Sequence, residues 1–233
     1  MSRFSSALRL NLLLQFRYGF YYAAAFVVVL WAAMLIPLPE SALSFATPLV
    51  VFAELAVIGY YFVAGMVLFE KDERTLYALV STPLRFSEYL GSKLATLTLM
   101  AVAASLIVVV AGHGSSFDVT LLILAVVLTS LISILAGFIS VLPFDAISRY
   151  LVPSQLPLFV MALPLVPFLD IWQNPVFYLI LTHGALILLS GAFGTTTPTT
   201  WQILYSILYG ILSIGLLCLI ARSTFDRYIV RGR

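Results

Sequence analysis

The chain has 233 residues, of which 62% are hydrophobic and only 9% are charged. Because a soluble domain carries about 25% charged residues, this composition excludes a soluble globular protein and indicates one all-α integral membrane domain over residues 1–233. The net charge of +2 gives no indication of a nucleic-acid partner, and the single cysteine excludes an intrachain disulfide and a cysteine-based metal site.

Six apolar stretches each approach the ~20 residues with which a helix crosses a bilayer. They cover residues 19–37, 47–69, 94–112, 119–141, 156–172 and 200–221. The twelve Lys and Arg residues all fall on one side of these spans. Three precede the first span, four lie between the second and third, one lies between the fourth and fifth, and four follow the last. Because basic residues concentrate in cytoplasmic segments, this pattern predicts six transmembrane helices with both termini in the cytoplasm.

Residues 4–17 interleave Leu and Phe with Ser, Arg, Asn and Gln. On a helical wheel Ser5, Ser6, Arg9 and Arg17 share one arc, although apolar residues intrude on it. This pattern predicts an N-terminal helix lying at the cytoplasmic interface. The alternative is that the segment is the tilted start of the first span.

Glu54 is the one acidic residue well inside a predicted span. At 1.5 Å per residue it would lie ~10 Å from the outer end of the second span. An ionisable side chain at that depth is costly and usually faces the bundle interior or water. We interpret Glu54 as a polar contact on the substrate path, with Tyr61 one heptad further along the same face. A structural hydrogen bond to a neighbouring Ser or Thr is the alternative.

Residues 70–93 form the longest polar stretch of the chain. Leu76, Leu79 and Val80 occur there at helical spacing, which predicts a short cytoplasmic helix. The Ser-Thr-Pro sequence that follows interrupts it, because the residue before a proline is disfavoured in the α region and proline suits the first turn of a helix. We therefore expect a break and then a helix from Pro83 that continues into the third span.

The second cytoplasmic loop, residues 142–155, carries Asp145 and Arg149. We expect one or two isolated turns of helix in it. The fifth span that follows it contains three prolines. In a membrane helix such prolines cause kinks, and neighbouring groups must satisfy the freed carbonyls.

Residues 174–194 are apolar enough to form a span, but a seventh span would place the arginine-rich tail outside. His183-Gly184 splits the segment into two pieces of about ten residues, and apolar lengths of about 10–14 are typical of re-entrant or interfacial segments. We expect a re-entrant helical hairpin that enters from the outer face, turns near His183 and brings this residue to the substrate path.

Motifs for chemistry are missing from the sequence. There is no P-loop and no H-E-x-x-H or G-x-S-x-G pattern. Ser190-Gly191 lacks the glycine that an intramembrane serine protease has two residues before its serine, because Leu188 stands there. We therefore predict no catalytic residue, no metal site and no bound cofactor, and the chain is not expected to be an enzyme.

The segment from Phe69 to Lys93 reads FEKDERTLYALVSTPLRFSEYLGSK. Its acidic–basic–acidic start, Thr-Leu pair, Thr-Pro-Leu break and Glu-Tyr-Leu entry to the next span resemble the segment that follows the second span of ABC-2-type permeases. The layout of the whole chain resembles that family as well, and it looks most like small antibiotic exporters of the fluoroquinolone type. One departure is Arg74, where the family often has glycine.

The resemblance implies a membrane subunit of an ATP-driven exporter that moves hydrophobic or amphipathic compounds out across the cytoplasmic (inner) membrane of a prokaryote. A separate P-loop ABC ATPase subunit would bind the ATP and Mg²⁺. Two ATPase copies would require a second permease chain, in a homodimer or a heterodimer.

The same resemblance implies where the ATPase binds. The short helix within residues 70–93 would be the coupling helix, and residues 144–152 would add a smaller contact. The coupling residues would be Leu76 and Leu79 as apolar contacts, Asp72, Glu73 and Arg74 at the rim, and Asp145 and Arg149 in the second loop.

A stand-alone channel or an ion-coupled transporter that uses Glu54 is the alternative function. Co-purification of a P-loop ATPase with the chain would discriminate between the two.

Overall fold

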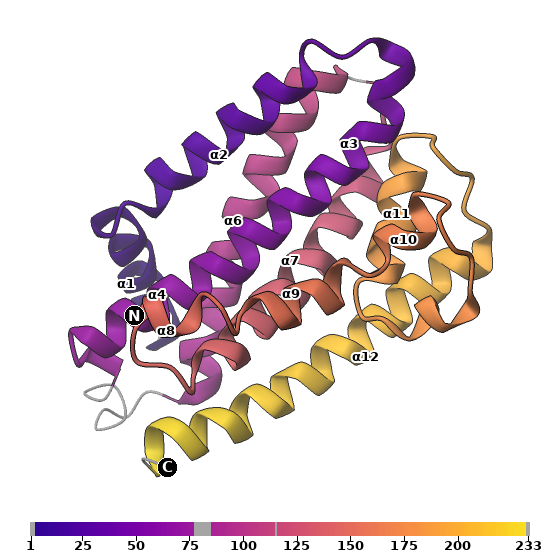
Figure 1. The fold of residues 1–233 in the computed structure, drawn as a ribbon. Coiled ribbons are helices and arrows are strands. Elements are labelled where there is room, and N and C mark those ends of the chain that lie inside the picture. The colour runs from indigo at the N-terminus through magenta and orange to yellow at the C-terminus, as the bar shows by residue number, and fades with distance from the viewer. Residues whose placement is uncertain (1–2, 77–84, 115, 232–233) are drawn as a thin grey trace.

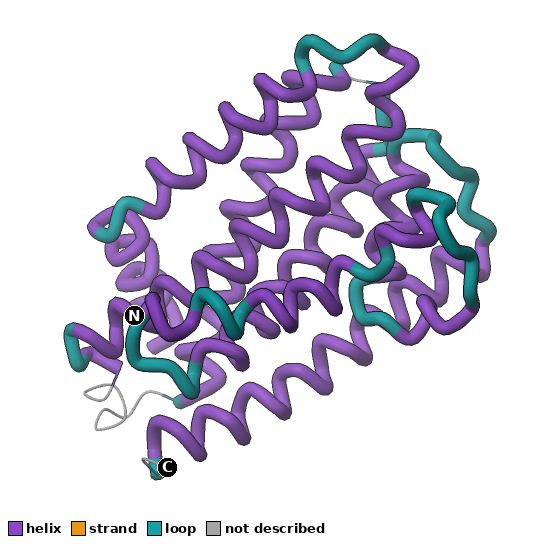
Figure 2. The backbone as a smooth tube through the Cα atoms, viewed as in Figure 1, coloured by secondary structure: helices purple, strands orange, loops and turns teal. Residues whose placement is uncertain are grey.

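A computed structural model describes residues 3–76, 85–114 and 116–231 as a bundle of helices, and no strand occurs among them (Figures 1 and 2). In chain order the elements are α1 (Arg3–Arg17), α2 (Phe20–Leu35), α3 (Glu40–Leu55), the π-helical η1 (Ala56–Tyr61), α4 (Phe62–Asp72), α6 (Phe86–His113), α7 (Val119–Val141), α8 (Ile147–Tyr150), α9 (Gln155–Ala162), α10 (Leu165–Phe168), the 3-10 helix η2 (Pro175–Leu179), α11 (His183–Ala192), α12 (Thr200–Phe225) and the π-helical η3 (Asp226–Val230). The expected all-α fold is confirmed for the described residues.

Four helices are long and apolar enough to cross a membrane, and each contains one of the six predicted spans. They are Glu40–Asp72, Phe86–His113, Val119–Val141 and Thr200–Val230. The first is continuous through α3, η1 and α4. The protein is therefore a multi-pass membrane protein by the length and composition of its helices.

The first predicted span is present as α2, which meets α1 at an angle of 65°. The bend falls at Gly19, whose φ of 77° lies in the left-handed region that glycine enters without a steric penalty. The face of α1 that packs on the bundle carries Asn11 and Gln15, whereas Leu13 and Phe16 are exposed. This geometry is compatible with the predicted interfacial helix, whose position in the membrane stays a prediction.

The fifth predicted span, residues 156–172, is not one continuous helix. The short helices α9 and α10 are separated at Leu163-Pro164, and the pair falls short of the length needed to span. Proline lacks the N–H that an α-helix requires and clashes with the preceding turn, so Pro164 breaks the helix. The prediction of six full-length spans is not confirmed.

Residues 174–194 form two pieces, as predicted, but the first piece is the 3-10 helix η2 and the turn at residues 180–182 precedes His183. The second piece, α11, packs against α7 and α12. A Cβ atom on Gly184 would lie 2.8 Å from the Cα of Ser206, so glycine permits the close approach of α11 to α12. Whether this segment dips into the bilayer stays a prediction.

The third-span helix starts later than expected. Arg85 is extended, with φ −79° and ψ 146°, and α6 begins at Phe86, so the helix is not continuous from Pro83. The Arg85 backbone N–H donates to Glu88 Oε2 at 2.8 Å, which satisfies one of the free N–H groups at the helix start. Pro83 itself lies outside the described residues.

The described Lys and Arg residues gather at one end of the bundle, at the lower left of Figure 1. This end holds α1, the end of α4, the start of α6, α8 and the end of α12. The loops α2–α3 and α6–α7 and the elements α10 and η2 lie at the opposite end. The folded chain thus separates the basic residues from the other end of the bundle, as the charge pattern of the sequence predicts.

Cysteine labelling tests the direction of this arrangement. In a Cys218→Ala background, we expect Thr197→Cys to react with a membrane-impermeant maleimide on intact cells, because Thr197 is exposed at the end without basic residues. Val230→Cys, at the basic end, should react only after lysis. Labelling of Val230→Cys on intact cells would place the arginine-rich tail outside and require an additional span.

Candidate functional site

The predicted coupling segment begins with a sharp turn after α4. Glu73 ends the helix, and Arg74 has a φ of 58°, in the left-handed region that favours glycine. A glycine would adopt this conformation without the steric penalty that the Arg74 side chain meets. Thr75 and Leu76 are helical again, whereas Leu79 and the rest of the predicted coupling helix lie outside the described residues.

The structure divides the predicted coupling residues into exposed and buried ones. Asp72, Glu73 and Arg74 are exposed, and their position at the rim of an ATPase contact stays a prediction. Leu76 is instead completely buried in the core of the chain itself. In this conformation Leu76 therefore offers no surface to a partner, and a substitution there would test folding rather than docking.

Lys71 brings the two predicted coupling segments together. Its Nζ atom donates to the carbonyl oxygens of Leu142 at 2.6 Å and Phe144 at 2.8 Å, and lies 3.5 Å from Asp145. The Lys71 side chain is almost fully buried, whereas Asp145 and Arg149 are exposed. The predicted second span ends at residue 69, so the sequence placed Lys71 in the following polar stretch, whereas the structure places it in the last turn of α4.

A buried ion pair lies beside this connection. Lys93 Nζ is 2.5 Å from Glu70 Oε1, and both side chains are at most 2% exposed. The hydroxyl of Tyr89 donates to Glu70 Oε2 at 2.7 Å. Lys93 also donates to Asn11 Oδ1 at 3.3 Å. Asn11 Nδ2 in turn donates to Ser92 Oγ at 2.7 Å. These five residues form the buried polar cluster that joins α1, α4 and α6. A buried ion pair offsets its desolvation only when such additional hydrogen bonds form.

Glu73 connects the same turn to the bend between α1 and α2. It accepts hydrogen bonds from the Tyr18 hydroxyl at 2.7 Å and from Arg17 Nη2 at 3.3 Å. Burial, followed by the hydrogen bond to Glu73, raises the pKa of Tyr18 to about 12. At neutral pH the Tyr18 phenol therefore stays protonated and remains a donor. At the basic end, the exposed charged residues at 72–74, 145 and 149 thus lie next to buried polar side chains that hold α4, α6 and residues 142–145 together.

Glu54 and Tyr61 have different surroundings in the described part of the chain. Glu54 is fully buried in α3, and neither carboxyl oxygen has a hydrogen-bond partner among the described residues. The Ser105 hydroxyl of α6 lies close to it and is equally unpartnered within the described chain. Tyr61 accepts a hydrogen bond from Gln155 Nε2 at 2.8 Å, which joins η1 to α9.

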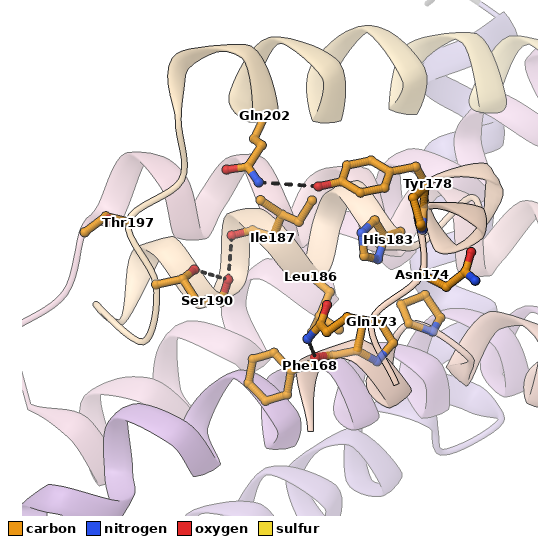
Figure 3. A pocket seen from close by; sticks show the side chains of 14 residues that line it. Phe168, Gln173, Asn174, Tyr178, His183, Leu186, Ile187, Ser190, Thr197 and Gln202 are labelled. Carbon is orange, nitrogen blue, oxygen red and sulfur yellow. Dashed lines mark hydrogen bonds between the residues drawn. The ribbon is translucent and has the colours of Figure 1, made fainter. Parts of the chain in front are cut away.

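A cavity of about 710 Å³ lies at the end opposite the basic residues (Figure 3). It is bounded by α10, η2, α11 and the start of α12. Its lining includes Phe168, Tyr178, His183, Ser190, Thr197 and Gln202, and no Asp, Glu, Lys or Arg. Of the three residues predicted on the substrate path, only His183 lines this cavity. Among the described residues, no cluster of His, Cys, Asp and Glu could hold a metal ion.

Comparison with known proteins adds independent information. Residues 2–233 match the fluoroquinolones export permease protein family. Two fluoroquinolones export permease proteins of Mycobacterium tuberculosis, from strains CDC 1551 / Oshkosh and ATCC 25618 / H37Rv, are each 41% identical over 232 residues. The alignments cover 99% of this chain and 98% of each relative. No solved structure matches the chain.

Proposed function

The chain belongs to the fluoroquinolones export permease family, and on that premise we propose that it is the membrane-spanning subunit of an ATP-driven exporter. The match over residues 2–233 is the observation that carries this proposal. Its substrates are hydrophobic or amphipathic compounds, and fluoroquinolones are included because the relatives are named for their export. The protein lies in the cytoplasmic membrane of a prokaryote with both termini inside.

The energy source is a separate subunit. The sequence has no P-loop, so ATP and Mg²⁺ bind to a separate P-loop ATPase subunit. Two copies of this ATPase associate with two permease chains, whose sequences are identical or different. The basic end supports ATPase docking there, because the exposed charges at 72–74 and at Asp145 and Arg149 are held near each other through Lys71. The resemblance to ABC-2-type permeases assigns the coupling contact to the same segments.

Transport by inside-out vesicles tests the proposal. We expect uptake of a fluoroquinolone to require hydrolysable ATP and to persist when an uncoupler removes the proton gradient. The tagged chain, purified in mild detergent from its own membranes, should bring a P-loop ATPase with it. Uptake that needs no ATP and stops with the uncoupler would overturn the proposal.

Ion coupling through Glu54 is the second candidate, favoured by one observation. The Glu54 carboxyl is fully buried and unpartnered among the described residues, and an ionisable group within a span often marks an ion path. If Glu54 carries protons, Glu54→Gln abolishes uncoupler-sensitive uptake. If the exporter is driven by ATP, the same variant keeps ATP-dependent uptake.

A further inference from the structure

We propose that a groove between the start of α6 and the end of α12 binds an anionic phospholipid of the cytoplasmic leaflet. The groove has a volume of about 570 Å³ and lies at the basic end of the bundle, where these two helix ends are found (Figure 1). The inference is independent of the compound that the protein transports. It rests on the proposed orientation only for the choice of leaflet.

Aromatic packing fixes the separation of the two helices that form the groove. The Phe86 ring, which lines the groove, packs on Phe225 of α12 with a centroid distance of 5.0 Å and on Phe138 of α7 at 6.2 Å. The Phe138 and Phe225 rings stack on each other at 6.3 Å. This cluster closes one side of the groove and joins the start of α6 to the end of α12.

Charged and apolar residues are separated along the groove. Arg85 and Arg222 lie nearest the basic ends of their helices. The lining residues further along the two helices are mainly apolar and include Leu90, Leu94, Cys218 and Leu219. From Phe86 to Leu94, α6 rises by ~12 Å at 1.5 Å per residue. This order is that of a phospholipid, whose phosphate lies at the membrane surface and whose acyl chains lie below it.

Both arginines are available to a ligand. Arg85 and Arg222 are exposed, and neither forms an ion pair with another described residue. No Asp or Glu of the described chain lines the groove. Glu88, the acid nearest to Arg85 in the sequence, accepts a hydrogen bond from the Arg85 backbone N–H at 2.8 Å. Because the N–H groups of a guanidinium match the spacing of phosphate oxygens, the two arginines suit a phosphodiester.

The apolar length of the groove favours a lipid over a water-soluble anion. A soluble phosphate compound would contact only the arginines, whereas an acyl chain also packs along the leucines of α6 and α12. Basic pockets between membrane helices at the cytoplasmic surface bind anionic headgroups in this way. Since an acyl chain has apolar surroundings in the bilayer as well, the headgroup charge decides which phospholipid binds.

Titration of the delipidated full chain in mild detergent tests the proposal. The probes are phosphatidylglycerol, which is anionic, and phosphatidylcholine with the same acyl chains, which is zwitterionic. Native mass spectrometry measures the dissociation constant of each. We expect phosphatidylglycerol to bind roughly tenfold more tightly, because only its headgroup presents a net negative charge to the arginines. Equal affinity for the two lipids would overturn the proposal.

Cys218 reports where the lipid binds, because it lines the groove and is the single cysteine of the chain. Phosphatidylglycerol should slow the reaction of Cys218 with N-ethylmaleimide, and phosphatidylcholine at the same concentration should not. Glycerophosphoglycerol, which is the same headgroup without acyl chains, should give no protection. Lipid binding without protection of Cys218 would place the lipid elsewhere, and equal protection by glycerophosphoglycerol would indicate a site for soluble anions. Either result would overturn the proposal.

Variants test the two arginines. Arg85→Gln and Arg222→Gln should each weaken phosphatidylglycerol binding about fivefold, as expected for one basic residue near an anionic headgroup. Binding of phosphatidylcholine should stay unchanged, and Arg222→Lys, which keeps the charge, should retain part of the affinity for phosphatidylglycerol. Because both side chains are exposed, the thermal midpoint without lipid should not change.

Arg227→Gln is the matched control. It removes a basic residue from the same end of the bundle, shortly after Arg222, but Arg227 does not line the groove. Unchanged phosphatidylglycerol binding in Arg85→Gln and Arg222→Gln, or an equal loss in Arg227→Gln, would overturn the site. These measurements need neither an ATPase nor a transported compound, so their failure is distinct from failure of the proposed export function.

Discussion

Glu70→Gln is expected to remove most of the folded protein from the membrane. The substitution leaves the Lys93 ammonium, which has no exposed surface, in the bundle interior without its counter-charge. Loss of one partner of a buried ion pair costs about 3–5 kcal/mol, which is a large fraction of the roughly 5–15 kcal/mol that stabilises a typical folded protein. The measurements are the yield of monodisperse protein in mild detergent and its thermal midpoint.

The exposed pair at the same end of the molecule is the matched control. Glu73→Gln disrupts the contact with Arg17, whose side chain is 70% exposed, and an exposed ion pair contributes at most about 1 kcal/mol. The double variant Glu70→Leu/Lys93→Met removes both charges and should recover much of the yield, because an apolar pair can replace a buried ion pair. Equal yields for Glu70→Gln and Glu73→Gln would show that the buried polar cluster is not structurally important.

Lys71→Met is expected to reduce export about tenfold while the protein still inserts and folds. Met keeps the length of the side chain but leaves the carbonyls of Leu142 and Phe144 without the donor that holds them. An unsatisfied buried acceptor costs about 1–3 kcal/mol, so residues 142–145 should detach from α4. The second predicted ATPase contact, at Asp145 and Arg149, would then no longer be aligned with the first.

Arg9→Met is the control for this experiment, since it removes a basic residue from the same end of the bundle at an exposed position of α1. Drug uptake by inside-out vesicles and the amount of ATPase that co-purifies should both fall in Lys71→Met and stay unchanged in Arg9→Met. Normal ATPase binding and normal uptake in Lys71→Met would show that the attachment of residues 142–145 to α4 is not needed for coupling to the ATPase.

The fifth predicted span shows where sequence patterns alone fail. Residues 156–172 are apolar enough to suggest a span, but apolarity does not specify a continuous helix. Pro164 ends α9, and the remaining residues form only the single turn α10. These broken pieces bound the cavity that also involves Tyr178 and Gln202, so the departure from the predicted span creates the candidate site.

The buried polar cluster illustrates a second limit. In the sequence, Glu70 and Lys93 bound the longest polar stretch of the chain, which predicts a cytoplasmic segment. They are 23 positions apart, and the pairing with each other and with Asn11 exists only once α1, α4 and α6 are packed together. Local patterns contain no information about such long-range partners.

The candidate site was only partly predictable. His183 was identifiable because it interrupts an apolar run. Tyr178 and Gln202 gave no comparable signal, since a single aromatic or amide residue in a loop is common in any membrane protein. The Glu54 prediction depended on span depth alone, which cannot show whether a buried carboxyl faces a cavity or the bundle interior.

The sequence by itself determined the membrane class, four candidate spans and the separation of charges to one end, because apolar length and the placement of Lys and Arg follow from composition and order along the chain. Tertiary structure decided which polar groups pair, where the apolar segment 156–172 breaks, and which side chains surround a cavity. These features depend on contacts between helices that are distant in sequence, where close packing and the cost of burying unpaired polar groups select one arrangement.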